Sequence, residues 1–153
     1  MPPISMSPRW RLAVAALGLG LLSACASWQD SPAGPRPLLY QQLGGEAGIT
    51  AVIDRTLERV STDPRSRRTF EGIKMPYLKK SVAAHVCRVA DGPCVYEGET
   101  MARAHGDLGI TGAEFDLMVQ VLREELDAAG ASTAAKNELL RRLAPMRRDI
   151  VQH

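Results

Sequence analysis

Aromatic side chains are scarce in this chain of 153 residues, which has two phenylalanines, two tryptophans and three tyrosines. Both tryptophans, Trp10 and Trp28, precede the segment in which a helical pattern of apolar residues begins. Aromatic rings normally fill much of the volume of a protein core. The core must therefore be built mainly from aliphatic side chains, unless a flat apolar group from outside the chain completes it.

Several patterns that would indicate other classes of protein are also missing. No stretch alternates apolar and polar residues convincingly with a period of two, so we expect an all-α fold. No Cys-x-x-Cys motif indicates a thiol redox centre, and His85 and His105 lack the usual spacing of zinc ligands. No serine or cysteine nucleophile adjoins His105, which argues against a role as catalytic base.

The first 24 residues have the features of an export signal. A positively charged start precedes an uncharged apolar run of thirteen residues at 12–24, shorter than the roughly 20 residues that a membrane span requires. The run ends in "LSAC" at Cys25, which resembles a bacterial lipobox, while cleavage at "ACA" by an ordinary signal peptidase is the alternative. We expect a lipoprotein signal peptide at 1–24 and a lipid-modified Cys25. This modification would anchor the protein to a membrane of the bacterial cell envelope, facing the periplasm.

Removal of residues 1–24 would take away Arg9 and Arg11 and no acidic residue, so the formal net charge falls from +2 to 0. The exported protein then has no basic excess, and we expect no nucleic acid partner. A segment rich in proline, glycine and small polar residues follows at 25–37 and is expected to be a flexible tether. The remaining residues, 38–153, are enough for one domain with its own core.

Cys87 and Cys94 are the two cysteines beyond Cys25, and they flank the turn-forming sequence "RVADGP". Export would place both in an oxidising compartment. Their separation of seven residues permits a disulfide, which we favour over two free thiols or a metal-binding pair.

Apolar residues recur at intervals of three and four in four segments, which predicts helices at 45–63, 75–90, 111–130 and 132–152. The residues predicted to form the inner faces of the first three are Ile49, Val52, Ile53, Leu57 and Val60, then Leu78, Val82, His85, Val86 and Val89, and finally Phe115, Met118, Val119 and Leu122.

Turn and cap residues mark the ends of these helices. Pro76 is expected in the first turn of the second helix, where the missing N–H has no consequence. The third helix opens with Thr111-x-x-Glu114, the pattern of a capping box, and Gly130 is expected to end it. Pro145 is expected to kink the fourth helix.

The stretch "MARAHGDLGIT", residues 101–111, contains His105 within a region, 92–109, that has many helix breakers and little apolar periodicity. From this pattern alone, a histidine on the surface or hydrogen-bonded in the core is the commoner outcome. One imidazole is nevertheless enough to hold haem, because the iron takes a single proximal histidine. A porphyrin would also supply the flat apolar volume that the few aromatic residues do not.

An ordered set of short motifs extends along residues 39–151. In chain order they are Gly44-Gly45, Phe70 within "TFEG", Gly92-Pro93, Tyr96-x-Gly98, and His105 followed by Gly106-x-x-Gly109-Ile110-Thr111. Together they resemble the group I truncated haemoglobins. The resemblance implies a two-over-two helical sandwich around haem b, with a shortened first helix and a proximal helix of about one turn inside a long loop.

The same resemblance implies roles for individual residues. His105 is the proximal iron ligand through Nε2, with its Nδ1–H directed at a nearby backbone carbonyl. Phe70 is expected against the haem face and Leu78 above the iron, while Gly106 and Gly109 are expected to turn the chain sharply after the ligand. The further expected haem contacts, each of which could equally be an ordinary core residue, are Met101, Ile110, Phe115 and Val119.

Two positions depart from the family pattern on the distal side of the haem. Leu57 stands, after Thr56, where the family usually has a tyrosine that hydrogen-bonds oxygen, and Val82 stands where a glutamine is common. We therefore expect an apolar distal pocket that holds oxygen loosely, since such a hydrogen bond typically adds ~1–2 kcal/mol. His85, three residues after Val82, either packs beside the pocket or binds the iron as a sixth ligand.

Three polar side chains have two interpretations each near the haem edge. Lys79 or Lys80 would pair with a haem propionate or belong to a solvated face. Tyr77 would lie over the haem edge or on the protein surface.

The resemblance implies a haem-binding globin that reversibly ligates O₂, or NO or CO, and that serves oxygen transport, storage or sensing rather than catalysis. A haem redox protein is the alternative, with NO dioxygenase or peroxidase-like activity or as a six-coordinate electron relay. The sequence does not identify a reductase partner. A helical interaction module without a cofactor is a further interpretation.

Overall fold

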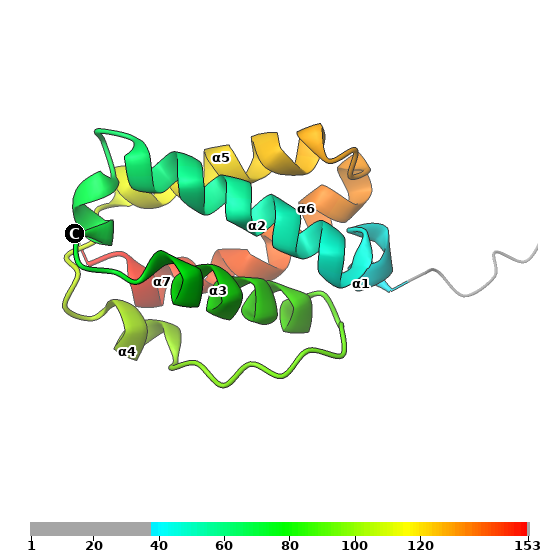
Figure 1. Cartoon of the computed structure of the whole chain (residues 1–153), viewed down its shortest axis with the longest axis horizontal. Coiled ribbons are helices and arrows are strands. Elements are labelled where there is room, and N and C mark those ends of the chain that lie inside the picture. Colours follow the sequence, from blue (N-terminus) through cyan, green and yellow to red (C-terminus); the bar gives the residue numbers. More distant parts are fainter. Residues whose placement is uncertain (1–37, 153) are drawn as a thin grey trace, which may run out of the picture. The chain divides into compact units, whose positions relative to one another are not determined.

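The structure, a computed structural model, describes residues 38–152. All regular elements in that range are helices and no strand occurs among these residues, so the predicted all-α fold is confirmed. In chain order they are α1 (Leu39–Gln42), α2 (Gly45–Thr62), the 3₁₀ helix η2 (Arg67–Phe70), α3 (Met75–Val89), α4 (Met101–His105), α5 (Gly112–Ala128), α6 (Thr133–Leu143), the 3₁₀ helix η3 (Ala144–Met146) and α7 (Arg147–Ile150) (Figure 1). None of these helices is both long and apolar enough to cross a membrane. The expected signal peptide, Cys25 and tether lie outside the described residues.

Helix α2 is the centre of the fold, because it packs against both α3 and α5 (Figure 1). Its predicted apolar stripe, which runs from Ile49 to Val60, is buried, and no side chain of the stripe is more than 3% exposed. Gly44 and Gly45 have φ angles of 85° and 66°, a backbone conformation that residues with a side chain rarely adopt. These two glycines therefore let the chain turn from α1 directly into α2.

The predicted signals at the ends of the later helices are confirmed. The Thr111 hydroxyl accepts a hydrogen bond from the Glu114 N–H at 3.3 Å, and the Glu114 carboxylate accepts one from the Thr111 N–H at 2.9 Å, which completes the capping box of α5. Gly130 follows α5 with a φ of 75°. At Pro145 the last predicted helix divides into α6, η3 and α7, because proline has no N–H to continue the helical ladder.

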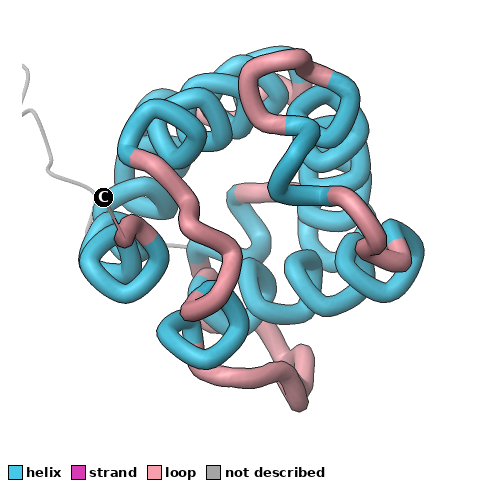
Figure 2. The backbone as a smooth tube through the Cα atoms, turned by 90° about the vertical axis from the view of Figure 1, so that its left-hand side faces the viewer, coloured by secondary structure: helices cyan, strands magenta, loops and turns pink. Residues whose placement is uncertain are grey.

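Helices α2 and α3 form one layer and α5 and α6 form the other, and Figure 2 views them along the length of the domain. Glu125 of α5 joins the layers, since its carboxylate accepts hydrogen bonds from Arg59 and Arg55 of α2, each at 2.7 Å. The Glu125 side chain is only 9% exposed. The hydrogen bonds from Arg59 and Arg55 lower the pKa of this carboxyl, so it remains charged in spite of its burial.

The buried faces of α3 and α5 agree only in part with the predicted inner faces, since Val86 and Leu122 are the predicted residues that are buried there. On α3 the buried residues are Ala83, Val86 and Cys87, and on α5 they include Leu117, Val121, Leu122 and Leu126. The predicted residues Leu78, Val82, His85, Val89, Phe115, Met118 and Val119 are only half-buried. Each helix thus has two adjacent apolar stripes, one in the core and one beside it. Periodicity does not separate the stripes, because both repeat every three or four residues.

Candidate cofactor site

His105 is the last residue of α4, a helix of only five residues. Its Nδ1 lies 2.8 Å from the carbonyl oxygen of Met101, one turn earlier, so the ring donates Nδ1–H to the backbone. This tautomer leaves the lone pair on Nε2, which is then the nitrogen available to a metal. A backbone acceptor at Nδ1 fixes the orientation of a metal-binding imidazole and raises its basicity.

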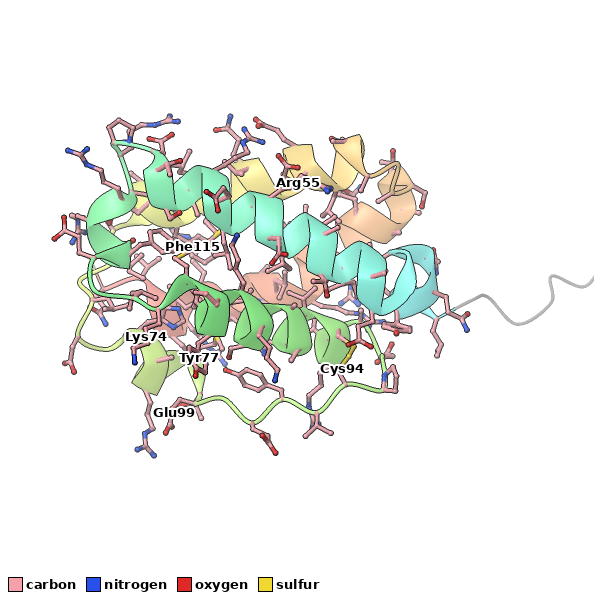
Figure 3. All side chains as sticks on the ribbon, viewed as in Figure 1. Arg55, Lys74, Tyr77, Cys94, Glu99 and Phe115 are labelled. Atoms are coloured by element: carbon pink, nitrogen blue, oxygen red, sulfur yellow. A yellow bond between two sulfur atoms is a disulfide. The ribbon has the colours of Figure 1, made fainter. Side chains whose placement is uncertain are left out.

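Contacts with the C-terminal helices bring α3, α4 and α5 together around this histidine. His85 of α3 contacts Met146 of η3. The guanidinium of Arg147 in α7 lies 5.5 Å from the ring centroid of Phe115 in α5, and α7 packs against α4. These elements therefore surround one region of the molecule, and Figure 3 shows Phe115 among its side chains.

The apolar side chains that these elements present are neither buried nor freely exposed. The half-buried ones are Phe70, Leu78, Val82, Met101, Ile110, Phe115 and Val119. Four of them also lie apart from the buried core formed by α2 and its neighbours: Met101, Ile110, Phe115 and Val119. Half-exposed apolar side chains on adjoining elements are typical of a site for a large apolar ligand.

His85 faces the same region from α3. Its Nε2 lies 3.4 Å from the sulfur of Met146, and its ring meets Tyr96 edge-on with the centroids 4.8 Å apart. Burial lowers the pKa of His85, and the positive charge of a protonated His105 lowers it further.

The chain turns after His105 at Gly109, which has a φ of 56° as the predicted role requires. The expectation for Gly106 is wrong, because this residue continues the helical conformation with φ −55° and ψ −31°. Arg68 of η2 holds the turn by donating to the Gly109 carbonyl at 2.8 Å and to the Glu114 carboxylate at 2.6 Å. Burial opposes ionisation of Glu114, but hydrogen bonds from Thr111 and Arg68 outweigh it and lower the pKa of this carboxyl.

The sequence matches the family described as bacterial-like globin over residues 38–152. The chain belongs to the bacterial-like globin family. A group 1 truncated haemoglobin from Mycolicibacterium paratuberculosis is 30% identical over 112 residues, which cover 73% of this chain and 82% of that protein. One from Nostoc commune is 28% identical over 109 residues, or 71% and 92% of the two chains. The crystal structure of the truncated haemoglobin from Tetrahymena pyriformis, 25% identical, superposes with a TM-score of 0.71 over 75% of this chain and 98% of that one.

Membership of a globin family implies a haem cofactor, and the residues of this globin fit one. The donor set is a single imidazole whose Nδ1 is already bonded to the backbone, which leaves Nε2 for iron. The surrounding side chains are apolar and half-buried, as the faces of a porphyrin require. No group of three or more histidine, cysteine or acidic side chains among the described residues would hold a bare metal ion instead.

The structure also gives the surroundings of the other residues that the sequence placed on the distal side or at the haem edge of this globin. Leu57 is 1% exposed and belongs to the core, and the Thr56 hydroxyl donates to the Val52 carbonyl at 2.8 Å within α2. Tyr77 is 74% exposed. Lys79 bonds to Glu58 of α2 at 3.0 Å.

Lys79 and Lys80 line a groove of about 710 Å³ between α2 and α3. The residues of α3 in that groove lie on the face opposite Leu78 and Val82. The structure therefore does not bring the two lysines to the candidate haem site of the globin.

Met146 and Gln152 were not found from the sequence, and the contact of Arg68 with the turn after His105 was not predicted. The side chain of Gln152 donates to the His105 carbonyl at 2.7 Å and accepts from the Gly109 N–H at 2.9 Å. These residues approach His85 or the turn after His105 from 41 to 61 positions away in the chain. No local sequence pattern carries information on such pairs.

Cys87 and Cys94 form a disulfide with a Cα–Cα distance of 5.9 Å, and Figure 3 shows it beside the label of Cys94. It joins the end of α3 to the long loop that carries Tyr96, whose ring contacts His85. Gly92 lies between the two cysteines, in the loop that the disulfide closes. A Cβ added at Gly92 would meet the Cys87 sulfur and the Tyr40 ring, each at 2.5 Å. The disulfide therefore ties the start of this loop to the end of α3, and Tyr96 of the loop meets His85 on the half-buried face.

Replacing both Cys87 and Cys94 by alanine should lower the free energy of unfolding by about 2 kcal/mol, because a short loop is no longer closed in the unfolded chain. Urea unfolding followed by circular dichroism would measure the loss. A thiol reductant should destabilise the wild-type protein by a similar amount and leave the double variant unchanged. Equal stability of the wild type and the variant under oxidising conditions would show that the disulfide contributes nothing.

Proposed function

We propose that this globin holds haem b through Nε2 of His105 and reversibly binds a diatomic gas, O₂ or alternatively NO or CO. The observation that carries the proposal is the hydrogen bond from Nδ1 of His105 to the Met101 carbonyl at 2.8 Å, which presents Nε2 to a metal. A haem supplies iron with one further coordination position for a gas.

The apolar residues of α3 and α5 would exclude water from the coordination position that the gas occupies. Leu78 and Val82 of α3, and Phe115 and Val119 of α5, offer no hydrogen-bonding group. Such surroundings favour the apolar porphyrin and slow the entry of water to the iron. Binding of a neutral gas requires nothing more from these side chains.

We infer that the gas is held without a strong polar contact. Leu57 and Val82 carry no donor, and the hydroxyl of Thr56 is bonded within its own helix. His85 is the remaining polar candidate, but its Nε2 contacts the sulfur of Met146. This contact supports a ferrous iron with five ligands and disfavours the six-coordinate electron relay.

Replacing His105 by glycine should remove the five-coordinate imidazole form of the ferrous haem, since the chain then supplies no proximal nitrogen. Absorption spectra of the ferric, ferrous and CO forms of the full-length protein would measure this change, and added imidazole should restore the wild-type spectra. His85→Gly is the matched control and should retain the five-coordinate form. A His105→Gly protein with wild-type spectra would disprove the proximal assignment.

Leu57→Tyr should slow the dissociation of O₂, because it restores a hydroxyl at the position where the family usually has tyrosine. One hydrogen bond of ~1–2 kcal/mol corresponds to a rate about 5- to 30-fold lower. Stopped-flow displacement of O₂ by CO would measure the rate. Leu57→Phe adds the same ring without the hydroxyl and should leave dissociation fast. If both variants slow dissociation equally, ring volume rather than a hydrogen bond controls oxygen release.

We also propose that lipid on Cys25 anchors the globin to the bacterial cell envelope, with the domain in the periplasm. The "LSAC" sequence after an uncharged apolar run supports this location. Cys25→Ser should move the protein from the membrane fraction to the soluble periplasmic fraction when it is expressed in a bacterium. Continued recovery of Cys25→Ser from the membrane fraction would refute lipid anchoring at this residue.

A further inference from the structure

We propose that Gln152 is a positioning residue for His105, an inference that rests on the proposed role of His105 as the iron ligand. The side-chain amide of Gln152 donates to the His105 carbonyl at 2.7 Å and accepts from the Gly109 N–H at 2.9 Å. The backbone N–H of Gln152 donates to the Ile110 carbonyl at 3.0 Å. One residue therefore makes three hydrogen bonds to the turn that follows the ligand.

The shortness of α4 explains why such a residue is needed. A helix of five residues cannot bond its last carbonyls internally, and one turn has little stability of its own. The His105 carbonyl accepts one local bond, from the Leu108 N–H at 3.1 Å, and the shorter bond comes from Gln152. The side chain of Gln152 thus completes the C-terminal end of α4 from a distant part of the chain.

The chemistry of the amide matches the two groups that it joins. A glutamine amide offers an N–H donor and an oxygen acceptor, and the turn presents one carbonyl and one N–H. A glutamate at this position would keep the acceptor for Gly109 but lose the donor for His105. The structure therefore requires an amide and not merely a polar side chain.

Arg68 fixes the other side of the same peptide segment. It donates to the Gly109 carbonyl, while Gln152 accepts from the Gly109 N–H. Gly109 is thus held by both of its backbone groups, but only Gln152 also reaches the residue that carries the imidazole. Through its hydrogen bond to the His105 carbonyl, Gln152 sets the position and tilt of the His105 backbone. The backbone in turn sets the strength of the bond from Nε2 to iron.

The test compares Gln152→Leu and Gln152→Glu with wild type, using full-length protein loaded with haem. Resonance Raman spectra of the ferrous, gas-free form report the iron–histidine stretching band. Transfer of haem to excess apomyoglobin reports the rate of haem loss. Gln152→Leu should shift and broaden the band and speed haem loss about fivefold or more, since one hydrogen bond of typical strength corresponds to about a fivefold change. Gln152→Glu should also shift the band, because it lacks the donor to His105.

Gln120→Leu is the matched control, because Gln120 is exposed and its amide bonds only to Glu124, at 3.0 Å, among the hydrogen bonds described. It should leave the band and the rate unchanged. If Gln152→Leu lowers the melting temperature but leaves the band at its wild-type frequency, its role is only structural and the inference is overturned. If Gln152→Leu does not fold, an unshifted band in Gln152→Glu overturns it in the same way. The His105→Gly variant distinguishes failure of this inference from failure of the proposed function. If His105 is not the iron ligand, the iron–histidine band survives in His105→Gly, whereas it disappears if only the role of Gln152 is wrong.

Discussion

The hydrogen bond from Nδ1 of His105 to the Met101 carbonyl is contained within a single turn of helix, and the position of the imidazole depends on that turn. Helix formation is cooperative, and so short a helix is not stable alone. Bonds from elsewhere in the chain supply what the turn lacks. The Thr100 side chain accepts from the Arg103 N–H at its start, Gln152 bonds at its end, and Arg68 holds the residues that follow. The short turn thus depends on residues that lie outside the long helices.

The long helices and their ends could be predicted from the sequence because their signals are local. Apolar spacing predicted α2, the capping-box pattern predicted the start of α5, and Pro145 predicted the break before α7. Apolar spacing did not show which of two adjacent stripes on α3 and α5 is buried, since both have helical periodicity. The choice depends on where α2 packs, which is a property of the assembled domain.

The site could be predicted only where a residue belongs to a motif. His105 and Gly109 stand within "HGDLGIT", and the geometry at both agrees with their expected roles. Arg68 and Gln152 act on the same turn but belong to none of these motifs, and they approach it from 41 and 47 positions away in the chain. The conformation of Gly106 was also mispredicted, because a glycine after a helix can continue the helix as readily as leave it.

The disulfide between Cys87 and Cys94 has a consequence for how the domain opens. Proteins unfold locally in units whose limits lie at well-anchored residues. Cys94 is covalently fixed to α3, and Thr111 is fixed by the capping box of α5. The chain between them, which contains α4, is also held by the bonds from Arg68 and Gln152, and when these break it can loosen as one unit while both of its ends stay in place. Amide hydrogens of 95–110 should then exchange together, and faster than those of α2 and α5, so the globin can admit a large planar ligand without dismantling its helical core.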